Sequence, residues 1–303
     1  MIINQNQAKK ILLSGGNVII PTETVYGLAG SIFHPEAIAR IYSLKQRPQK
    51  NPLIIHAATI DQILTLVTKV PKSFFQLATH FWPGPLTLIL QAKETIHASI
   101  TGGLPTVGVR IPNHQATLNL IKETGPLAAP SANLSGKPSS TRLIHLEKDF
   151  GINIPILEGY SPTHGVESTI LGWIDSSWQI LRYGCITKES IEQLLEEPIL
   201  DSELPICPGK QFKHYSPQAT LFCSLAALHT AEAIIGYENR NYPLSLPFYS
   251  LGQDTDPVAI AYNLFATFRQ IDEDNHSKVW IDIDLPTQGL YQTIIERILR
   301  AIE

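Results

Sequence analysis

Short apolar runs alternate with amphipathic segments from residue 17 to residue 195, and this alternation constrains the fold more than any other feature. The runs NVII (17–20), PLIIHA (52–57), PLTLILQA (85–92) and TVGVRI (106–111) have the length and composition of strands. Between the runs, HPEAIARIYSLKQ (34–46) and NHQATLNLIKETG (113–125) place apolar residues at helical spacing. Alternating strands and helices predict an α/β domain.

A proline-rich segment divides the chain after residue 195. EPILDSELPICPGKQFKHYSPQATLF contains four prolines and little periodicity, which is typical of a linker. Beyond it, ATLFCSL and KVWIDID have the pattern of strands, and AIAYNLFATFRQID and LYQTIIERILRAI have the pattern of amphipathic helices. We therefore expect a domain of residues 1–195, a linker of residues 196–218 and a small α/β domain of residues 219–303.

Charge and cysteine content limit the classes of function. The 303 residues carry a net charge of -4, which argues against a broad nucleic-acid-binding surface. The cysteines are Cys185, Cys207 and Cys223, and because no C-x-x-C occurs, neither a disulfide framework nor a zinc site is predicted. No apolar run approaches the roughly 20 residues of a membrane helix. We expect a cytoplasmic protein that does not bind a membrane.

Three cations gather in SLKQRPQKNPLIIH (43–56), directly before a predicted strand. Lys45 lies in the last turn of a predicted helix, where a cation interacts favourably with the helix dipole. Arg47 and Lys50 lie beyond the helix, so the dipole does not account for them, and three such donors suit a polyphosphate. Neither G-x-x-x-x-G-K-[ST] nor G-x-G-x-x-G occurs, so side chains and another loop would have to hold a nucleotide.

Two hydroxyl-rich segments could provide that loop. PSANLSGKPSST (130–141) has the composition of a polar turn, but it follows an apolar run and could surround phosphate oxygens and a ribose. PTETVYGLAG (21–30) is predicted as a loop after the strand NVII. It would serve either as a helix-capping turn or as a holder for a small polar ligand.

Two residues of the predicted strands have more than one interpretation. Arg110 lies in an otherwise apolar strand, and buried arginines are rare without a partner. It either forms an internal ion pair or binds the carboxylate of a ligand. His56 ends the strand PLIIH, where a lone histidine is more often structural than catalytic.

Taken together, these segments resemble the YrdC-like family of L-threonylcarbamoyladenylate synthases. The matching segments, in the order of that family, are PTETVYGL, the K-x-R of LKQRPQKNPLIIH, WPGPLTLIL, TVGVRIP, the S-x-N of APSANLSG, ESTI and ILRYG, spanning residues 10–185. The linker CPGKQFKHYSP resembles the P-G-x-x-x-x-H-Y-[SA]-P signature of the long, two-domain branch. The resemblance implies a twisted, open mixed sheet with helices, followed by a small Rossmann-like C-terminal α/β domain.

The resemblance also implies a reaction. The amine of L-threonine takes up CO2 from bicarbonate, and the carbamate attacks the α-phosphate of ATP, releasing pyrophosphate and leaving L-threonylcarbamoyl-AMP. The chain would thus be a nucleotidyltransferase acting in the first step of tRNA threonylcarbamoyladenosine modification. Downstream proteins would transfer the threonylcarbamoyl group to tRNA, so stable nucleic-acid binding by this chain is not expected. Such chemistry depends on positioning and charge neutralisation and needs no protein nucleophile.

By motif position, the resemblance assigns roles to individual residues. Lys45 and Arg47 would be the catalytic cations that meet the triphosphate. The ATP site would comprise Lys45, Arg47, Asn51, Thr106, Asn133, Thr141, Arg182 and Tyr215, with Tyr215 closing over ATP from the linker. The threonine site would comprise Thr24, His56, Arg110, Ser131 and Ser168. Mg2+ would accompany ATP, with phosphate and water as most of its ligands.

Two alternatives remain open from the residues alone. A non-catalytic RNA-binding module could use the same basic residues, although the net charge and the lack of aromatic residues near the cations count against it. The other alternative is an enzyme of similar fold that makes a carbamoyl or acyl phosphate from a different amine.

Overall fold

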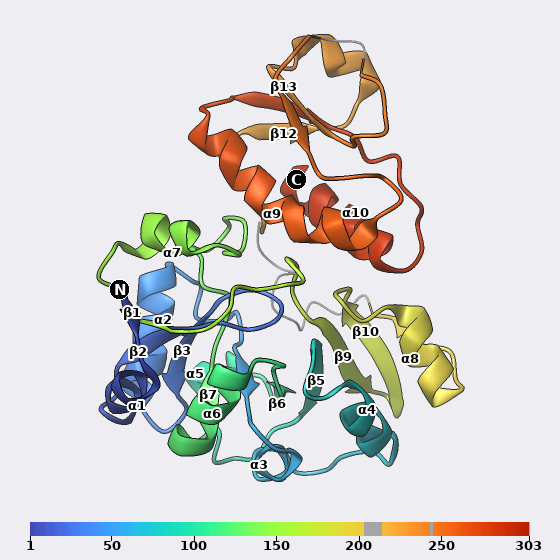
Figure 1. Ribbon diagram of the computed structural model, residues 1–303. Coiled ribbons are helices and arrows are strands. Elements are labelled where there is room, and N and C mark those ends of the chain that lie inside the picture. The colour runs from blue at the N-terminus through green and yellow to red at the C-terminus, as the bar shows by residue number, and fades with distance from the viewer. Residues whose placement is uncertain (203–213, 243–244, 303) are drawn as a thin grey trace.

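The structure is a computed structural model that describes residues 1–202, 214–242 and 245–302. Two α/β units are stacked on one another, and each is built on its own sheet (Figure 1). The larger sheet has eleven strands and the smaller has four. This architecture confirms the predicted fold class. Most of the predicted linker, residues 203–213, lies outside the described residues.

The large sheet is mixed. Its strands are β1 (Ile2–Ile3), β2 (Asn17–Ile20), β3 (Gly27–Ser31), β4 (Ile54–His56), β5 (Leu86–Gln91), β6 (Thr106–Arg110), β7 (Leu127–Ala128), β8 (Ile156–Leu157), β9 (Thr169–Ile174), β10 (Ser177–Arg182) and β11 (Leu200–Asp201). Their spatial order is β1-β8-β2-β3-β7-β4-β6-β5-β9-β10-β11. The sheet contains parallel pairs such as β4 with β6 and β5 with β9, and antiparallel pairs such as β2 with β3 and β9 with β10.

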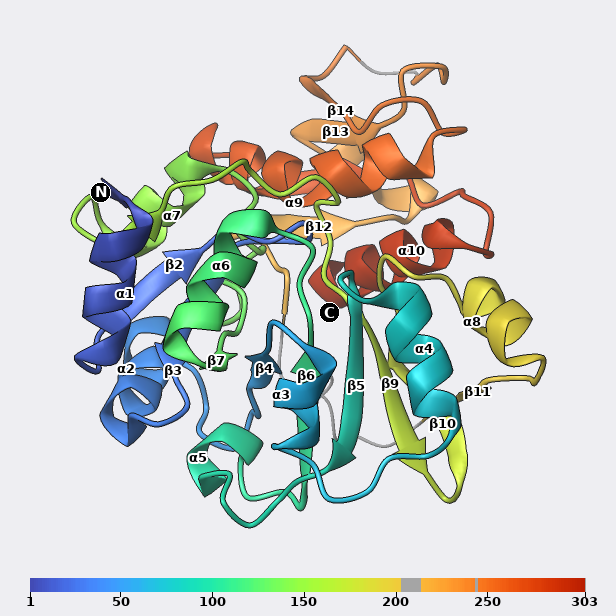
Figure 2. The ribbon, with the colours of Figure 1, turned by 60° about the horizontal axis from the view of Figure 1, so that its bottom comes forward.

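Helices flank this sheet (Figure 2). They are α1 (Gln5–Leu13), α2 (Pro35–Lys45), α3 (Ile60–Leu64), α4 (Ser73–Phe81), α5 (Ala98–Thr101), α6 (Gln115–Thr124), α7 (Leu143–Phe150) and α8 (Lys188–Leu195). Helix α2 begins with Pro35, whose fixed φ suits the first helical position, and ends at Lys45, where Gln46 caps it in the left-handed conformation. That left-handed turn delivers the next residue, Arg47, to the interior instead of continuing the helix.

The prediction that PTETVYGLAG is a loop throughout was wrong for its second half. Residues Gly27–Ser31 form β3, which pairs antiparallel with β2 on one side and with β7 on the other. The strand contains small residues because helix α2 packs closely against it. A Cβ on Gly30 would lie 2.8 Å from the side-chain nitrogen of Asn17 and 3.2 Å from the Cβ of Ala37.

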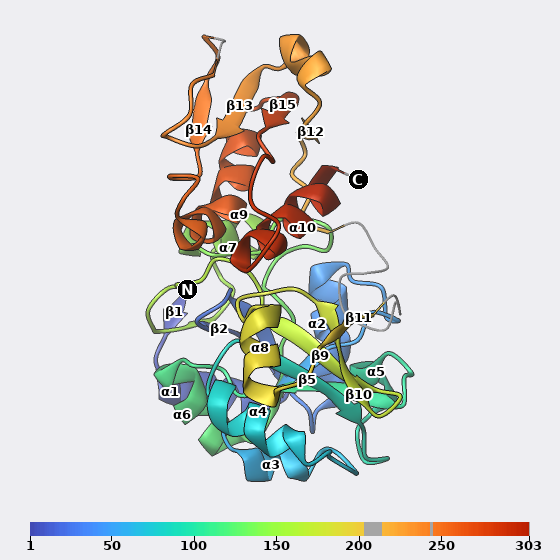
Figure 3. The ribbon, with the colours of Figure 1, turned by 90° about the vertical axis from the view of Figure 1, so that its right-hand side faces the viewer.

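The small unit is a parallel sheet covered by two long helices. Its strands are β12 (Thr220–Phe222), β13 (Ala233–Gly236), β14 (Phe248–Ser250) and β15 (Lys278–Ile281), in the order β12-β15-β13-β14. A 3-10 helix η1 (Leu225–Thr230) follows β12, and α9 (Pro257–Glu273) and α10 (Leu290–Ile302) correspond to the two predicted amphipathic helices. Both helices lie between the small sheet and the large unit (Figures 1 and 3).

The two units share buried contacts. The apolar core of the small unit includes Val166 of the large unit and Tyr215, which follows the undescribed part of the linker. The backbone also approaches closely here, because a Cβ on Gly165 would lie 2.4 Å from the carbonyl oxygen of Ala261 in α9. The segment directly before β9 is therefore packed between the two units.

Candidate active site

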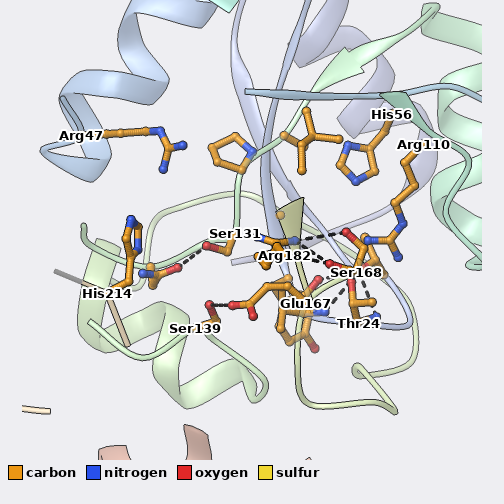
Figure 4. Close-up of a pocket in the computed structure, with 18 of the residues that line it drawn as sticks. Thr24, Arg47, His56, Arg110, Ser131, Ser139, Glu167, Ser168, Arg182 and His214 are labelled. Atoms are coloured by element: carbon orange, nitrogen blue, oxygen red, sulfur yellow. Dashed lines mark hydrogen bonds between the residues drawn. The ribbon is translucent and has the colours of Figure 1, made fainter. Parts of the chain in front are cut away.

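A cavity lined by polar and charged side chains lies beside the large sheet (Figure 4). Its walls come from the segment after β2, the turn after α2, the ends of β4, β6 and β10, the loop after β7, the segment before β9 and the linker. The structure brings together nine of the thirteen predicted site residues on these walls: Thr24, Arg47, His56, Arg110, Ser131, Asn133, Ser168, Arg182 and Tyr215.

Arg47 is held in place by the loop that follows it. Its guanidinium donates to the side-chain oxygen of Asn51 (2.6 Å) and to the carbonyl oxygen of Pro52 (2.8 Å). Burial lowers the pKa of Arg47 to about 10, which still leaves the group charged at neutral pH. Arg47 therefore presents a fixed cation to the cavity, while Asn51 lies behind it as its hydrogen-bond partner.

Lys45 lies beneath the cavity wall. It is 1% exposed, and its ammonium donates to the carbonyl oxygens of Ser131 and Asn133. Burial, and then the charge of Arg47, hold the pKa of Lys45 well below its usual range. Its described contacts support the S-x-N loop, and the predicted contact of Lys45 with a triphosphate stays a prediction.

The S-x-N loop is braced by its own side chains. Ser131 Oγ donates to Asn133 Oδ1 (2.6 Å), and Asn133 Nδ2 donates to the carbonyl oxygens of Leu134 and Lys137. The loop also joins the sheet, because Ser131 forms an isolated bridge with Gly27 at the start of β3. Ser131 and Asn133 are thus fixed on a rigid loop at the cavity, as binding residues require.

Arg110 and His56 are neighbours across the parallel strands β6 and β4. Arg110 Nη2 lies 2.7 Å from Glu23 Oε2, and its Nη1 donates to Thr24 Oγ1 (3.0 Å). Both interpretations of Arg110 fit the structure, because it has an internal carboxylate partner and also lines the cavity. Burial raises the pKa of Glu23, but the charge and the hydrogen bond of Arg110 lower it. The net effect is a pKa below the ordinary value.

His56 is held neutral. Burial, and then the charge of Arg110, lower the pKa of His56 to about 3. Its ring atom Nδ1 is buried and has no hydrogen-bond partner among the described residues. An unpartnered polar atom at a cavity is costly unless a ligand or water completes it, so His56 fits a ligand contact.

Ser168 and Arg182 form the opposite wall. Arg182 Nε and Nη2 donate to the carbonyl oxygen of Ser168 at 3.2 and 2.9 Å, and Ser168 Oγ lies 2.8 Å from Thr87 Oγ1. These bonds join the residue before β9 to the end of β10. They orient the guanidinium of Arg182 at the cavity (Figure 4).

The described end of the linker also reaches the cavity. Tyr215 is buried, and its ring stacks on Phe265 of α9 with ring centroids 5.2 Å apart. His214 beside it has a pKa lowered to about 3 by burial and then by Arg47, and its Nε2 has no described partner. That Tyr215 closes over ATP stays a prediction.

Four predicted site residues do not lie on the cavity wall. Lys45 and Asn51 are behind it, as described above. Thr106 lines a separate small hollow with Pro52 and Ile54, and Thr141 is buried with no described partner for its Oγ1.

The sequence analysis overlooked Ser139, Glu167 and His214. Ser139 Oγ donates to Glu167 Oε1 (2.6 Å), and both residues line the cavity (Figure 4). Glu167 is the only carboxylate among the described lining residues. Glu167 could have been found from the sequence because it directly precedes Ser168 in the motif ESTI. Ser139 could have been found because it belongs to the hydroxyl-rich segment PSANLSGKPSST.

The site combines three guanidinium groups, two neutral imidazoles and several hydroxyls, which suits anion binding. None of the lining serines in the described part of the chain is hydrogen-bonded to a histidine, so a serine nucleophile has no base there. No group of three or more metal-ligating side chains occurs in residues 1–202, 214–242 and 245–302. Within the same ranges, no helix is long and apolar enough to cross a membrane.

Comparison with known families gives two matches along the chain. The Sua5/YciO/YrdC family, described as "Telomere recombination", matches residues 10–184. The family described as "Threonylcarbamoyl-AMP synthase, C-terminal domain" matches residues 186–302.

Individual relatives match over nearly the whole chain. The threonylcarbamoyl-AMP synthase of Bacillus subtilis is 36% identical over 97% of this chain and 92% of its own length. That of Pyrococcus abyssi is 35% identical over the same shares. A crystal structure of Pyrococcus abyssi Sua5 complexed with L-threonine superposes with a TM-score of 0.90 at 32% identity, covering 100% of this chain and 97% of the other.

Proposed function

The chain belongs to the Sua5/YciO/YrdC family, and from this premise we propose that it is an enzyme that makes L-threonylcarbamoyl-AMP. Its substrates would be L-threonine, bicarbonate and ATP, and the reaction would be a nucleotidyl transfer. A carbamate formed on the threonine amine attacks the α-phosphorus. The bond to the bridging oxygen then breaks, and pyrophosphate leaves with that electron pair. This synthesis would be the first step of tRNA threonylcarbamoyladenosine formation, and the product would pass to the next step.

The proposal rests chiefly on the match along the whole chain to a relative whose structure holds L-threonine. The cavity supports it independently, because it joins fixed cations to a neutral imidazole with an unpartnered nitrogen. In this proposal Arg47 and Arg182 neutralise the phosphates. Arg110, Thr24 and His56 bind threonine, and Arg110 contacts its carboxylate while remaining paired with Glu23.

Further site residues would act through position. Ser131 and Asn133 would lie between threonine and the nucleotide, and Tyr215 would cover the nucleotide from the linker side. Lys45 would fix the S-x-N loop from below. Preorganised donors of this kind lower the barrier because they need no rearrangement when charge develops.

Mg2+ would enter with ATP as part of the substrate. Glu167, the carboxylate on the described wall, is already bonded to Ser139 and Arg297. The residues therefore fit an ion that keeps phosphate oxygens and water as its main ligands, which Mg2+ tolerates. Its role would be to neutralise charge on the phosphates.

We expect the enzyme to act in the cytoplasm and to pass its product to proteins that modify tRNA. It would not itself bind nucleic acid stably. The RNA-binding alternative predicts affinity that falls steeply with salt. A small-molecule site instead predicts saturation with threonine.

The decisive experiment follows pyrophosphate release by the purified chain with Mg-ATP, bicarbonate and L-threonine, omitting each component in turn. Release that needs all three supports the proposal. Replacing threonine with serine or glycine distinguishes the enzyme that uses another amine, because that enzyme would work faster with the substitute. Absence of threonine-dependent release from a folded protein that binds ATP would overturn the proposal.

A further inference from the structure

One residue of the small unit reaches the walls of the cavity without lining it. Arg297, on helix α10, has no exposed surface. Its Nε donates to Glu167 Oε2 (3.0 Å) and its Nη2 donates to the carbonyl oxygen of Tyr183 (2.7 Å). Its guanidinium carbon also lies 4.9 Å from the centroid of the Tyr215 ring, within cation–π range.

These three contacts reach three different parts of the site. Glu167 directly precedes Ser168, and its other carboxylate oxygen accepts from Ser139. Tyr183 directly follows Arg182, and Thr293 of the same helix donates to the next carbonyl oxygen, that of Gly184 (2.9 Å). Helix α10 therefore holds the strand end that carries Arg182, together with the segment that carries Ser168.

The charges explain why an arginine is needed at this position. Glu167 is a buried carboxylate on the wall of a site that otherwise presents cations. Burial alone would raise its pKa, but the charges of Arg297 and then Arg182, together with the hydrogen bonds from Ser139 and Arg297, bring the pKa below its ordinary value. Glu167 is therefore ionised, and Arg297 is the cation that most strongly compensates its charge. Without Arg297, the carboxylate would draw on Arg182 alone.

We propose that Arg297 is a positioning residue that neutralises Glu167, so that Arg182 remains available to an anionic substrate. The small domain is then a component of the active site through the contact of Arg297 with Glu167. The inference rests on the proposed function, because it takes ATP as the anion that Arg182 meets. Arg297 itself touches no substrate.

A second interdomain arginine provides the matched control. Arg269 of α9 is similarly buried and pairs with Asp149 of α7 at 2.6 Å. It also donates to the carbonyl oxygen of Pro138 (2.6 Å). Neither partner lines the cavity. Arg269→Met therefore breaks a comparable buried ion pair between the same two units whose partners are not themselves lining residues.

The test compares Arg297→Met with Arg269→Met in the full chain. We expect both variants to melt at lower temperature than the wild type. Arg297→Met should raise the KM for Mg-ATP by about tenfold with kcat changed by less than about threefold, because an interaction with bound substrate is weakened. Arg269→Met should leave this KM unchanged. An equal KM in the two variants would overturn the proposal.

The double variant Arg297→Met with Glu167→Gln separates neutralisation from packing and covers the case in which the single variant fails to fold. Removing both charges leaves no carboxylate at position 167 to compensate, and Glu296, which also pairs with Arg297, keeps its bond to Arg300, so we expect the KM for Mg-ATP to return to within about threefold of the wild type. A double variant with an elevated KM for ATP would contradict the proposal. Calorimetric binding of Mg-ATP to each variant gives the same comparison without turnover. If the wild type binds ATP but releases no pyrophosphate, the proposed function fails while this inference is still tested.

Discussion

Each unit of the molecule gathers charged and hydroxyl groups at one place, but the two clusters are completed differently. In the small unit, Arg240 bonds to Asp254 (2.8 Å) and Asp282 (3.0 Å), and Tyr242 donates to Asp282 as well (2.9 Å). Tyr237 donates to the backbone carbonyl of Asp282 (2.9 Å). We call these five residues the strand-end cluster, because they lie at or beyond the carboxyl ends of β13, β14 and β15.

The cluster around the cavity is not complete in this way. His56 Nδ1 and His214 Nε2 are buried without a described partner, whereas no side-chain atom of the strand-end cluster is in that condition. Buried polar groups that satisfy each other stabilise a fold, and those left unsatisfied are a cost that a ligand can remove. The comparison suits a binding role for the polar residues around the cavity and a stabilising role for the strand-end cluster.

The sharpest way to break this comparison is to remove one cation from each cluster. We expect Arg47→Ala to lower the rate of pyrophosphate release by about 10²–10³, the effect of losing one preorganised charge donor, and Lys45→Ala to lower it as much because the S-x-N loop loses its support. Arg240→Ala should change the rate by less than about threefold, since it lies in the other cluster. Steady-state assays of thermally characterised variants provide the measurement. Near-wild-type turnover by both Arg47→Ala and Lys45→Ala would contradict the assignment of Arg47 and Lys45 to the active site.

The free energy of unfolding should depend more on the strand-end cluster than the rate of pyrophosphate release does. Arg240→Met leaves Asp282, which is 6% exposed, without its cation. We expect a loss of about 2 kcal/mol in the free energy of unfolding, less than the ~3–5 kcal/mol for a fully buried pair because Arg240 is partly exposed. Urea unfolding monitored by circular dichroism checks this value. A variant as stable as the wild type would mean that the strand-end cluster contributes nothing net.

The pH dependence of folding stability tests the unsatisfied side of the comparison at His56. Its pKa is about 3 in the folded chain and ~6.5 when unfolded, so between these pH values the unfolded chain binds the extra proton. The contribution of His56 to the free energy of unfolding is therefore fully present above the unfolded pKa. As the pH decreases below that value, the contribution falls by about 1.4 kcal/mol per pH unit. His56→Gln should flatten the pH dependence by that slope between pH ~6 and ~4.5.

The smallest effect is expected at a satisfied bond between the units. Thr293→Val keeps the side-chain shape but removes the bond to the carbonyl oxygen of Gly184. We expect a loss of about 1 kcal/mol in unfolding free energy with no change in KM for ATP, as for one buried neutral hydrogen bond. A raised KM would show that the contact reaches the site and does more than stabilise the fold.

Elements with a sustained pattern could be predicted from the sequence. Helix α10 and strand β5 follow their apolar periodicity closely, whereas β1 and β8 are two-residue strands with no pattern to read. Strand β3 was missed because its glycines and alanine suit a loop unless a helix packs closely above them. Such an approach depends on the tertiary arrangement.

The residues of the site likewise divide into those that could be predicted from the sequence and those that could not. Residues within the family motifs, such as Arg47 and Ser168, could be placed on the cavity because their local sequence is distinctive. The burial of Lys45 beneath the S-x-N loop could not be predicted, since a helix-terminal lysine is usually exposed. Arg297 gave no signal at all, because one arginine on an amphipathic helix reads as part of its polar face.

The pairing of Glu167 with Arg297 also has a consequence for the time course of synthesis. The two residues are 130 positions apart, so at about 5–20 residues per second a ribosome needs roughly 10 s between them. All the strands of the large sheet are made before α10 exists. The nascent large domain thus acquires its cations early, whereas the charge of Glu167 is compensated by Arg297 only after α10 has been made.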